Sequence, residues 1–153
     1  MSYTFLNIEG HGAYSSDMAF VLHEIDRDFF PTPWSLDSWK YLFNEQERLL
    51  VVMNLDDVTI GFCLFDKIID DSFAHLLKII IHPNYRGQGL SKKLLRQALL
   101  NLHMRGYRHF FLEVEESNFA AQKLYSSEGF KIIHRKKDFY GANRAALIMT
   151  FDE

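Results

Sequence analysis

The sequence is poor in cysteine, in proline and in long apolar runs. Cys63 is the single cysteine among 153 residues, which excludes an internal disulfide and is typical of a protein from a reducing compartment. No apolar run approaches the length that spans a bilayer, and residues 1–9 lack the basic start and apolar core of a signal peptide. We therefore expect a cytoplasmic protein that does not bind a membrane.

The sequence also lacks an excess of either charge. Its 17 lysine and arginine residues and 20 aspartate and glutamate residues leave a net charge of −3, and the basic residues are scattered. Affinity for nucleic acid is therefore not expected. With three prolines, no repeats and 48% apolar residues, the whole chain, 1–153, is expected to form one globular domain, as a monomer or a homodimer.

Hydrophobic periodicity predicts an alternation of strands and helices. Period-two alternation and short apolar runs predict strands at residues 3–8, 49–53, 59–66, 76–82, 108–114, 130–137 and 145–151. Helical spacing and capping residues predict helices at 15–27, 36–44, 92–100 and 117–128. This order is that of an α/β protein with one mixed sheet, in which the unit 76–114 forms a parallel strand pair through a right-handed crossover.

A glycine-containing loop, residues 86–91, joins the fourth predicted strand to the following helix. At a helix start, backbone N–H groups lack intrahelical acceptors and the helix dipole is positive. Gly87 and Gly89 keep Cβ atoms out of the way, and Arg86 and Lys92 add positive charge. The loop predicts a phosphate site, although it lacks the glycine spacing of a P-loop or a dinucleotide-binding fingerprint. The alternative is a glycine turn that only tightens the junction.

The second informative segment contains a carboxylate inside a strand. Glu113 has apolar neighbours, so it needs a partner or has a raised pKa, which makes it a candidate general base. Asn118, Ala121 and Tyr125 share one face of the next helix, where a ligand can approach the backbone and end near the phenol. Alternatively, Glu113 forms a structural salt bridge with Lys78, Asn118 is only a cap, and Tyr125 is only a core residue.

Other side chains are weaker candidates. No histidine and cysteine have metal-ligand spacing, so no metal is expected. His82 and His134 are expected to be solvated or structural, and Cys63 to lie in the core. Aromatic residues in loop or proline-interrupted segments are either core residues or the walls of a substrate groove; they are Phe29, Phe30, Trp34, Trp39, Phe139 and Tyr140.

These segments resemble the GNAT superfamily of acetyl-CoA-dependent N-acetyltransferases, and most of all its RimI-type branch, which acetylates the N-terminal amine of ribosomal protein S18. The resemblance runs from about residue 29 to residue 149. The loop at 86–91 carries it, together with Leu112, Glu113, Val114, Ser117, Asn118, Leu124, Tyr125, Gly129 and Phe130. The RimI-type branch is matched by Pro33-Trp34-Ser35, by the basic-aromatic stretch at 135–140 and by the last strand.

The resemblance implies a fold and a set of functional residues. The fold is a single mixed, mostly antiparallel twisted sheet with flanking helices and a central parallel strand pair splayed for acetyl-CoA. Glu113 would be the general base and Tyr125 the general acid of acetyl transfer to a primary amine. The implied cofactor-binding residues are Ile79, Ile80 and Ile81 beside the pantetheine arm, Asn118 touching it, and Arg86, Gly87, Gln88, Gly89, Leu90, Ser91 and Lys92 around the pyrophosphate.

The implied acceptor is a peptide or protein N-terminal α-amine, with a ribosomal protein as one candidate. The alternatives are a small amine such as an aminoglycoside, polyamine or amino acid, and a non-catalytic acyl-CoA-binding module. Three departures from the family pattern bear on this choice. Ser91 replaces Gly or Ala in the loop, Glu115-Glu116 replaces Arg-Ala, and Arg144-Ala145 replaces Glu-Asp before the last strand. The last two departures bear on peptide specificity.

Overall fold

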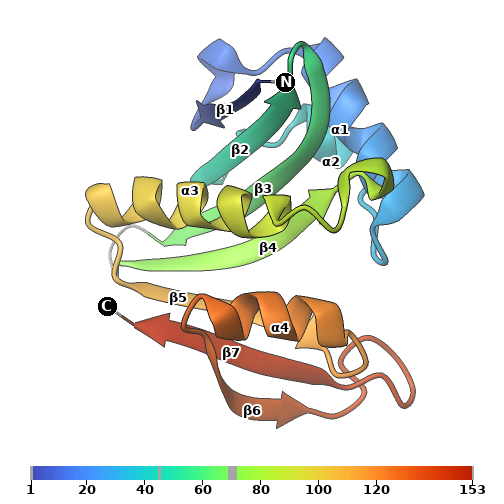
Figure 1. Cartoon of the computed structure of the whole chain (residues 1–153), viewed down its shortest axis with the longest axis vertical. Helices are drawn as coiled ribbons and strands as arrows, with labels where there is room; N and C mark the ends of the chain where they lie inside the picture. The colour runs from blue at the N-terminus through green and yellow to red at the C-terminus, as the bar shows by residue number, and fades with distance from the viewer. Residues whose placement is uncertain (1, 45, 69–71, 153) are drawn as a thin grey trace.

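A computed structural model of the chain describes residues 2–44, 46–68 and 72–152. Its strands form one sheet in the order β1-β2-β3-β4-β5-β7-β6 (Figure 1). All neighbouring strands are antiparallel except β4 and β5, which are parallel. The strands are β1 (Tyr3–Ile8), β2 (Arg48–Leu55), β3 (Val58–Ile68), β4 (Phe73–Ile81), β5 (His109–Glu115), β6 (Lys131–Lys136) and β7 (Ala146–Asp152).

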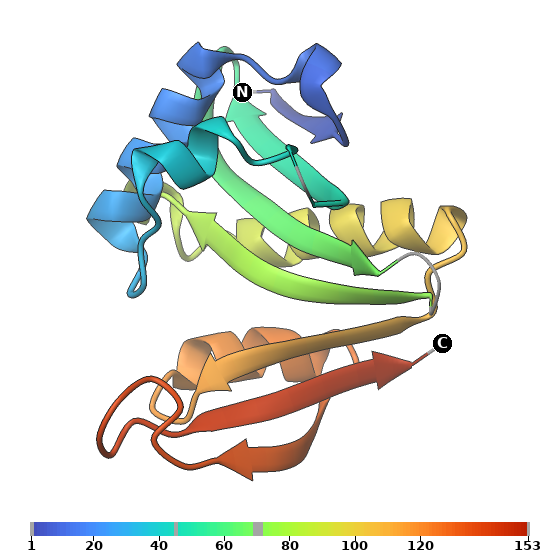
Figure 2. The same ribbon diagram turned by 180° about the vertical axis from the view of Figure 1, so that it is seen from behind.

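Helices cover both faces of the sheet. The helices are α1 (Ser16–Phe29), α2 (Leu36–Lys40), α3 (Leu90–Met104) and α4 (Phe119–Ser127). Helices α3 and α4 lie on one face, and α1 and α2 lie on the other face over the N-terminal half of the sheet (Figures 1 and 2). One apolar cluster fills the space under α3 and α4, and a second fills the space under α1 and α2. The arrangement confirms the predicted α/β fold.

Local sequence determines where the helices begin. Ser15 and Ser35 accept hydrogen bonds from the backbone N–H groups three residues later, at the starts of α1 and α2. Helix α3 instead follows Gly89, whose φ of 73° is left-handed and suits a residue without a Cβ atom. None of the helices in the described part of the chain is long and apolar enough to cross a membrane.

The parallel pair of strands separates halfway along its length. Pairing between β4 and β5 runs from Phe73 and His109 to Leu76 and Leu112 and stops there. Strand β4 continues to Ile81, still paired with β3. A β-bulge at the separation point makes Leu76 pair with Phe65 and Lys78 with Leu64, which leaves Leu77 as the extra residue. Bulges bend a strand, and this one lies where the two strands part.

Candidate active site

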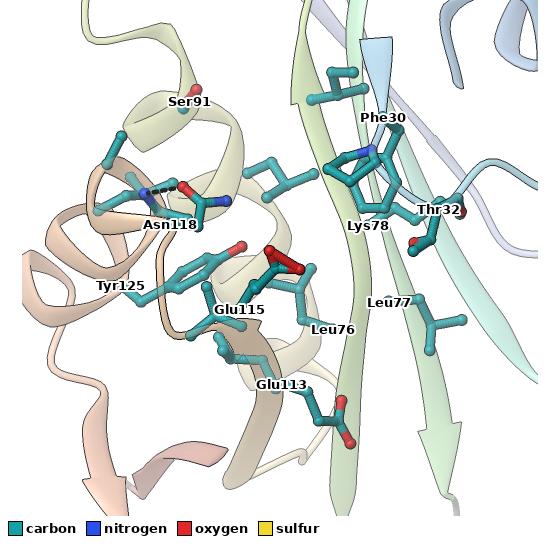
Figure 3. A pocket seen from close by; sticks show the side chains of 18 of the residues that line it. Phe30, Thr32, Leu76, Leu77, Lys78, Ser91, Glu113, Glu115, Asn118 and Tyr125 are labelled. Atoms are coloured by element: carbon teal, nitrogen blue, oxygen red, sulfur yellow. Dashed lines mark hydrogen bonds between the residues drawn. The ribbon is translucent and has the colours of Figure 1, made fainter. Parts of the chain in front are cut away.

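A cavity of about 790 Å³ opens where β4 and β5 separate. Its walls come from β4, β5, α4, the segment between α1 and α2, and the loop between β6 and β7. In Figure 3 the side chains of α4 and β4 face one another across this gap. Cavities at the carboxyl ends of parallel strands are the usual ligand sites of α/β sheets.

The edge of β4 that faces the gap offers backbone hydrogen-bonding groups. Beyond Leu76 this edge no longer pairs with β5, and Ile79, Ile80 and Ile81 all line the cavity. An extended ligand can therefore lie beside β4 as an added strand would. These are the three residues to which the family resemblance assigns that role.

The predicted phosphate loop forms a tight turn at the same end of the cavity. Gly87 and Gly89 have φ values of 78° and 73°, and a Cβ atom added to either would meet nothing within 4 Å. The guanidinium of Arg86 donates from Nε to the carbonyl of Ile81 at 2.8 Å, which ties the turn to the end of β4. The turn therefore presents backbone rather than side chains to a ligand.

The first turn of α3 supplies N–H groups without intrahelical acceptors. Its first backbone hydrogen bond runs from Lys93 to the carbonyl of Gly89, so the N–H groups that precede Lys93 are free to bind an anion.

The side chains of the loop and of the first turn of α3 have different surroundings. Ser91, the departure from the loop pattern, lines the cavity. The side chain of Leu90 is buried in the core, and Lys92 approaches Glu128 at 4.0 Å. Gln88 accepts a hydrogen bond from the Tyr3 hydroxyl.

Asn118 has two features at once. It caps α4, since its side-chain oxygen accepts from the backbone N–H of Ala121 at 3.2 Å, and it lines the cavity. The capping bond uses the amide oxygen, so the amide NH2 group remains to contact a ligand. The interpretation as a cap and the interpretation as a ligand contact are therefore compatible.

Glu113 and Tyr125 approach the gap from opposite sides. Leu112 and Val114 face the apolar cluster under α3 and α4 that contains Tyr125, so strand alternation puts Glu113 on the other face of the sheet. Figure 3 shows the hydroxyl of Tyr125 pointing into the cavity from α4, and the carboxylate of Glu113 reaching toward β4. The opening between the strands connects the two groups.

Burial raises the pKa values of the two phenols in the cavity. Desolvation raises the pKa of Tyr125 well above its ordinary value of 10, so this phenol carries its proton at neutral pH. Tyr140 lies in the loop between β6 and β7; burial, together with the charges of Glu113 and Glu115, raises its pKa to about 12. Both phenols are therefore protonated at neutral pH. The effect of Glu113 on the pKa of Tyr140 also shows that these two side chains lie near each other.

The predicted partner of Glu113 is wrong. Lys78 donates from Nζ to Asp26 in α1 at 2.8 Å and to the carbonyl of Thr32 at 2.8 Å. Glu113 instead pairs with His75 of β4, with 2.5 Å between His75 Nε2 and Glu113 Oε2. Sequence reasoning missed His75, although its place one residue before an apolar run in the adjacent strand offered a signal.

Both glutamates of the Glu115-Glu116 departure pair with arginines, and one of these arginines, Arg144, belongs to the other departure. Arg144 donates from Nε to Glu115 Oε1 at 2.8 Å, and Arg135 donates from Nε to Glu116 Oε2 at 2.5 Å. These hydrogen bonds hold the pKa values of both carboxyl groups below their usual range. Glu115 and Arg144 line the cavity, so their ion pair ties the loop between β6 and β7 to the end of β5.

The remaining candidates divide between wall and core. Four of the aromatic residues line the cavity, namely Phe29, Phe30, Phe139 and Tyr140. Trp39 and Cys63 are fully buried, and Trp34 packs against the cluster under α1 and α2. His82 accepts from the N–H of Asn84 and packs against Phe29, which is a structural role, whereas His134 is exposed on β6.

Comparisons with known proteins agree with this geometry. A family model described as the acetyltransferase (GNAT) family matches residues 19–130. The chain is 34% identical over 135 residues to a ribosomal protein bS18-alanine N-acetyltransferase of Haemophilus ducreyi, covering 84% of this chain and 90% of that protein. The corresponding Haemophilus influenzae protein is 33% identical over 134 residues, covering 84% and 88%.

A solved structure shows the same fold. The crystal structure of the ribosomal-protein-S18-alanine N-acetyltransferase from Escherichia coli superposes with a TM-score of 0.86 at 24% identity, covering 99% of this chain and 94% of that chain. The family match, the two relatives and the shared fold confirm the predicted family and enzyme class. The chain belongs to the GNAT acetyltransferase family and is an acetyl-CoA-dependent N-acetyltransferase.

Proposed function

We propose that the enzyme acetylates protein N-terminal α-amines, with Glu113 as general base and Tyr125 as general acid. The observation that carries the proposal is the mostly buried carboxylate of Glu113 and the buried phenol of Tyr125 on opposite sides of one cavity. The relatives named as ribosomal protein bS18-alanine N-acetyltransferases support an N-terminal alanine as the acceptor.

The residues present fit a coenzyme A thioester. The turn at Gly87 and Gly89 is open to a phosphate group, because a Cβ atom added to either glycine would meet nothing within 4 Å beyond the adjacent residues of the chain. The unpaired edge of β4 suits the amide groups of a pantetheine arm, and Asn118 faces the same space. Acetyl-CoA bound there would supply the activated acetyl group. We propose that residues 86–92, Ile79, Ile80, Ile81 and Asn118 hold it.

The reaction needs two proton transfers, one from the acceptor amine to Glu113 and one from Tyr125 to the departing sulfur. An α-amine has a pKa near 8, so at neutral pH it is mostly protonated and must lose a proton before its nitrogen can attack. Glu113 accepts that proton directly or through a water. The N–C bond forms as the C–S bond breaks, and the departing sulfur takes a proton from the hydroxyl of Tyr125. Holding amine and thioester together supplies much of the rate.

The acceptor is tested by thiol release from acetyl-CoA. The panel contains a peptide with a free N-terminal alanine and an internal lysine, the same peptide with a blocked N-terminus, a polyamine and an aminoglycoside. We expect thiol release with the free peptide and an acetyl group on its first residue by mass spectrometry. Lysine-only products, or turnover of small amines alone, would contradict the proposed acceptor while leaving the enzyme class intact.

Gly87→Asp should abolish binding of acetyl-CoA. The change puts a carboxylate where a phosphate is expected and strains a residue whose φ is 78°. Losing one charge-assisted hydrogen bond costs roughly 1.5–3 kcal/mol, which alone raises the dissociation constant about 10- to 150-fold. Repulsion between the new carboxylate and the phosphate adds to this loss, so calorimetry should show a rise of about 100-fold or more. Gly106→Asp is the matched control, since Gly106 also has a positive φ and a Cβ atom there also meets nothing within 4 Å. An unchanged dissociation constant for Gly87→Asp would remove the turn from the phosphate site.

Tyr125→Phe should lower kcat about 10- to 100-fold with little change in the KM for acetyl-CoA. A thiol has a pKa near 8.5, so a thiolate leaves without full protonation, and the effect of a single acid is smaller than that of the base. Steady-state kinetics measure it. Tyr107→Phe is the control, because Tyr107 is another buried phenol of the same apolar cluster. An equal loss in both variants would indicate packing rather than acid catalysis.

A further inference from the structure

His75 and Glu113 meet at the point where β4 and β5 separate. His75 directly precedes Leu76, and Glu113 directly follows Leu112, and these two leucines form the last pair of the parallel ladder. His75 Nε2 lies 2.5 Å from Glu113 Oε2, and both side chains are about three-quarters buried, with exposed fractions of 23% and 24%. Both residues line the cavity. The contact therefore bridges the apex of the opening.

The imidazole ring of His75 is held in place from a second direction. It stacks on Phe111 with 4.3 Å between ring centroids and an interplanar angle of 11°. Phe111 in turn packs edge-on against Phe73, at 6.3 Å. All three residues lie where β4 and β5 are still hydrogen-bonded to each other, so the sheet fixes their backbone positions. The imidazole is thus a fixed donor rather than a mobile surface group.

The chemistry of the contact assigns its proton. A lone pair on the nitrogen and a lone pair on the oxygen would repel each other at 2.5 Å, so a proton lies between His75 Nε2 and Glu113 Oε2. A carboxylate that acts as a base has no proton of its own, so Nε2–H donates to it. This hydrogen bond occupies Oε2 and leaves Oε1 to receive a proton from the acceptor amine.

In the described part of the chain, the other cationic side chains that line the cavity all bind partners other than Glu113. Lys78 is bound to Asp26, Arg86 to the carbonyl of Ile81, and Arg144 to Glu115. The hydrogen bond from His75 is therefore what fixes the carboxylate. A carboxylate on a three-bond side chain otherwise samples several rotamers, and misplacing a catalytic group by 1 Å can cost about 100-fold in rate.

We propose that His75 is a positioning residue that orients Glu113 for proton abstraction from the acceptor amine. This inference rests on the proposed role of Glu113 as the general base. It predicts that loss of the Nε2–H donor slows the chemical step, leaves acetyl-CoA binding unchanged, and matters only when Glu113 is present.

The test compares His75→Phe with His75→Gln in the full chain. Phenylalanine keeps the stack on Phe111 and removes the donor, so kcat should fall about 10- to 100-fold while the KM for acetyl-CoA stays within twofold. Glutamine puts an amide N–H near the position of Nε2, so kcat should recover to within about threefold of the parent. His109→Phe is the matched control, because His109 pairs with a carboxylate in the same way, Asp152 of β7 at 2.9 Å, but at the opposite end of β5 from Glu113.

The double variant His75→Phe/Glu113→Gln separates this inference from the proposed function. Its kcat should equal that of Glu113→Gln alone, because a missing base leaves nothing to orient. If Glu113→Gln lowers kcat but His75→Phe does not, the positioning role is overturned and the base assignment stands. If the losses of the two single variants multiply in the double variant, His75 acts independently of Glu113, which also overturns the proposal. If Glu113→Gln retains full kcat, both assignments fail.

Discussion

Glu113→Gln is expected to lower kcat about 100- to 10,000-fold, the range that a positioned general base contributes, with little change in the KM for acetyl-CoA. The substitution keeps the shape of the side chain and a carbonyl oxygen that can still accept from His75, so it removes basicity rather than packing. Thiol release with a saturating N-terminal peptide measures kcat, and the KM for acetyl-CoA measures whether the cofactor site is intact.

The deficit of this variant should also shrink as the pH rises. Without a base, attack depends on the fraction of acceptor already deprotonated, which grows about tenfold per pH unit below the amine pKa near 8. Glu116→Gln is the matched control, because Glu116 lies three residues away and pairs with Arg135 at the surface. A kcat for Glu113→Gln within twofold of the parent at pH 7 would contradict the role of Glu113.

The sequence predicts the strands, the helix starts and the loop at 86–91 well, because these features depend on local patterns. Period-two alternation and short apolar runs locate each strand of the sheet in the described part of the chain, and the glycine loop locates the start of α3. The predicted second helix is too long: α2 ends at Lys40, and the carbonyl of Leu42 is taken by the guanidinium of Arg48 at 3.1 Å. That hydrogen bond joins residues whose proximity only the folded sheet creates.

Side-chain partners across the sheet are harder to predict, because they depend on register. The pairing of His75 with Glu113, 38 residues apart in the sequence, requires the parallel register of β4 and β5. The orientation of Lys78 depends on the bulge at Leu77, which turns Lys78 toward α1. Neither the register nor the bulge has a local sequence pattern, so the wrong partner for Glu113 followed from missing both.

A buried ion pair holds one wall of the cavity against β4. Lys78 and Asp26 are almost fully buried, and Asp26 also accepts from the backbone N–H of Trp34 at 2.7 Å and from Nε1 of Trp39 at 2.9 Å. Lys78 Nζ lies 4.1 Å from the centroid of the Phe30 ring and donates to the carbonyl of Thr32. Phe30 and Thr32 line the cavity, so the pair ties one wall to β4.

Lys78→Met should therefore lower the free energy of unfolding by about 3–5 kcal/mol, the cost of leaving one member of a buried pair without its partner. For a chain of this size the Tm should fall on the order of 10 °C. The variant also loses the contacts of Lys78 with Phe30 and with the carbonyl of Thr32. If this wall contacts the peptide acceptor, as the proposed function implies, the KM for the peptide should rise more than the KM for acetyl-CoA. Thermal unfolding and steady-state kinetics measure these effects.

A second substitution distinguishes an unpaired charge from lost packing. In Lys78→Met/Asp26→Asn the charge is gone, and the asparagine oxygen can still accept from Trp34 and Trp39, so the double variant should recover at least half of the lost Tm. Arg27→Met removes the cation of the exposed Arg27–Asp28 pair and should leave the Tm unchanged. If the double variant is less stable than Lys78→Met alone, the stem of Lys78 and the shape of Asp26, rather than their charges, hold this wall in place.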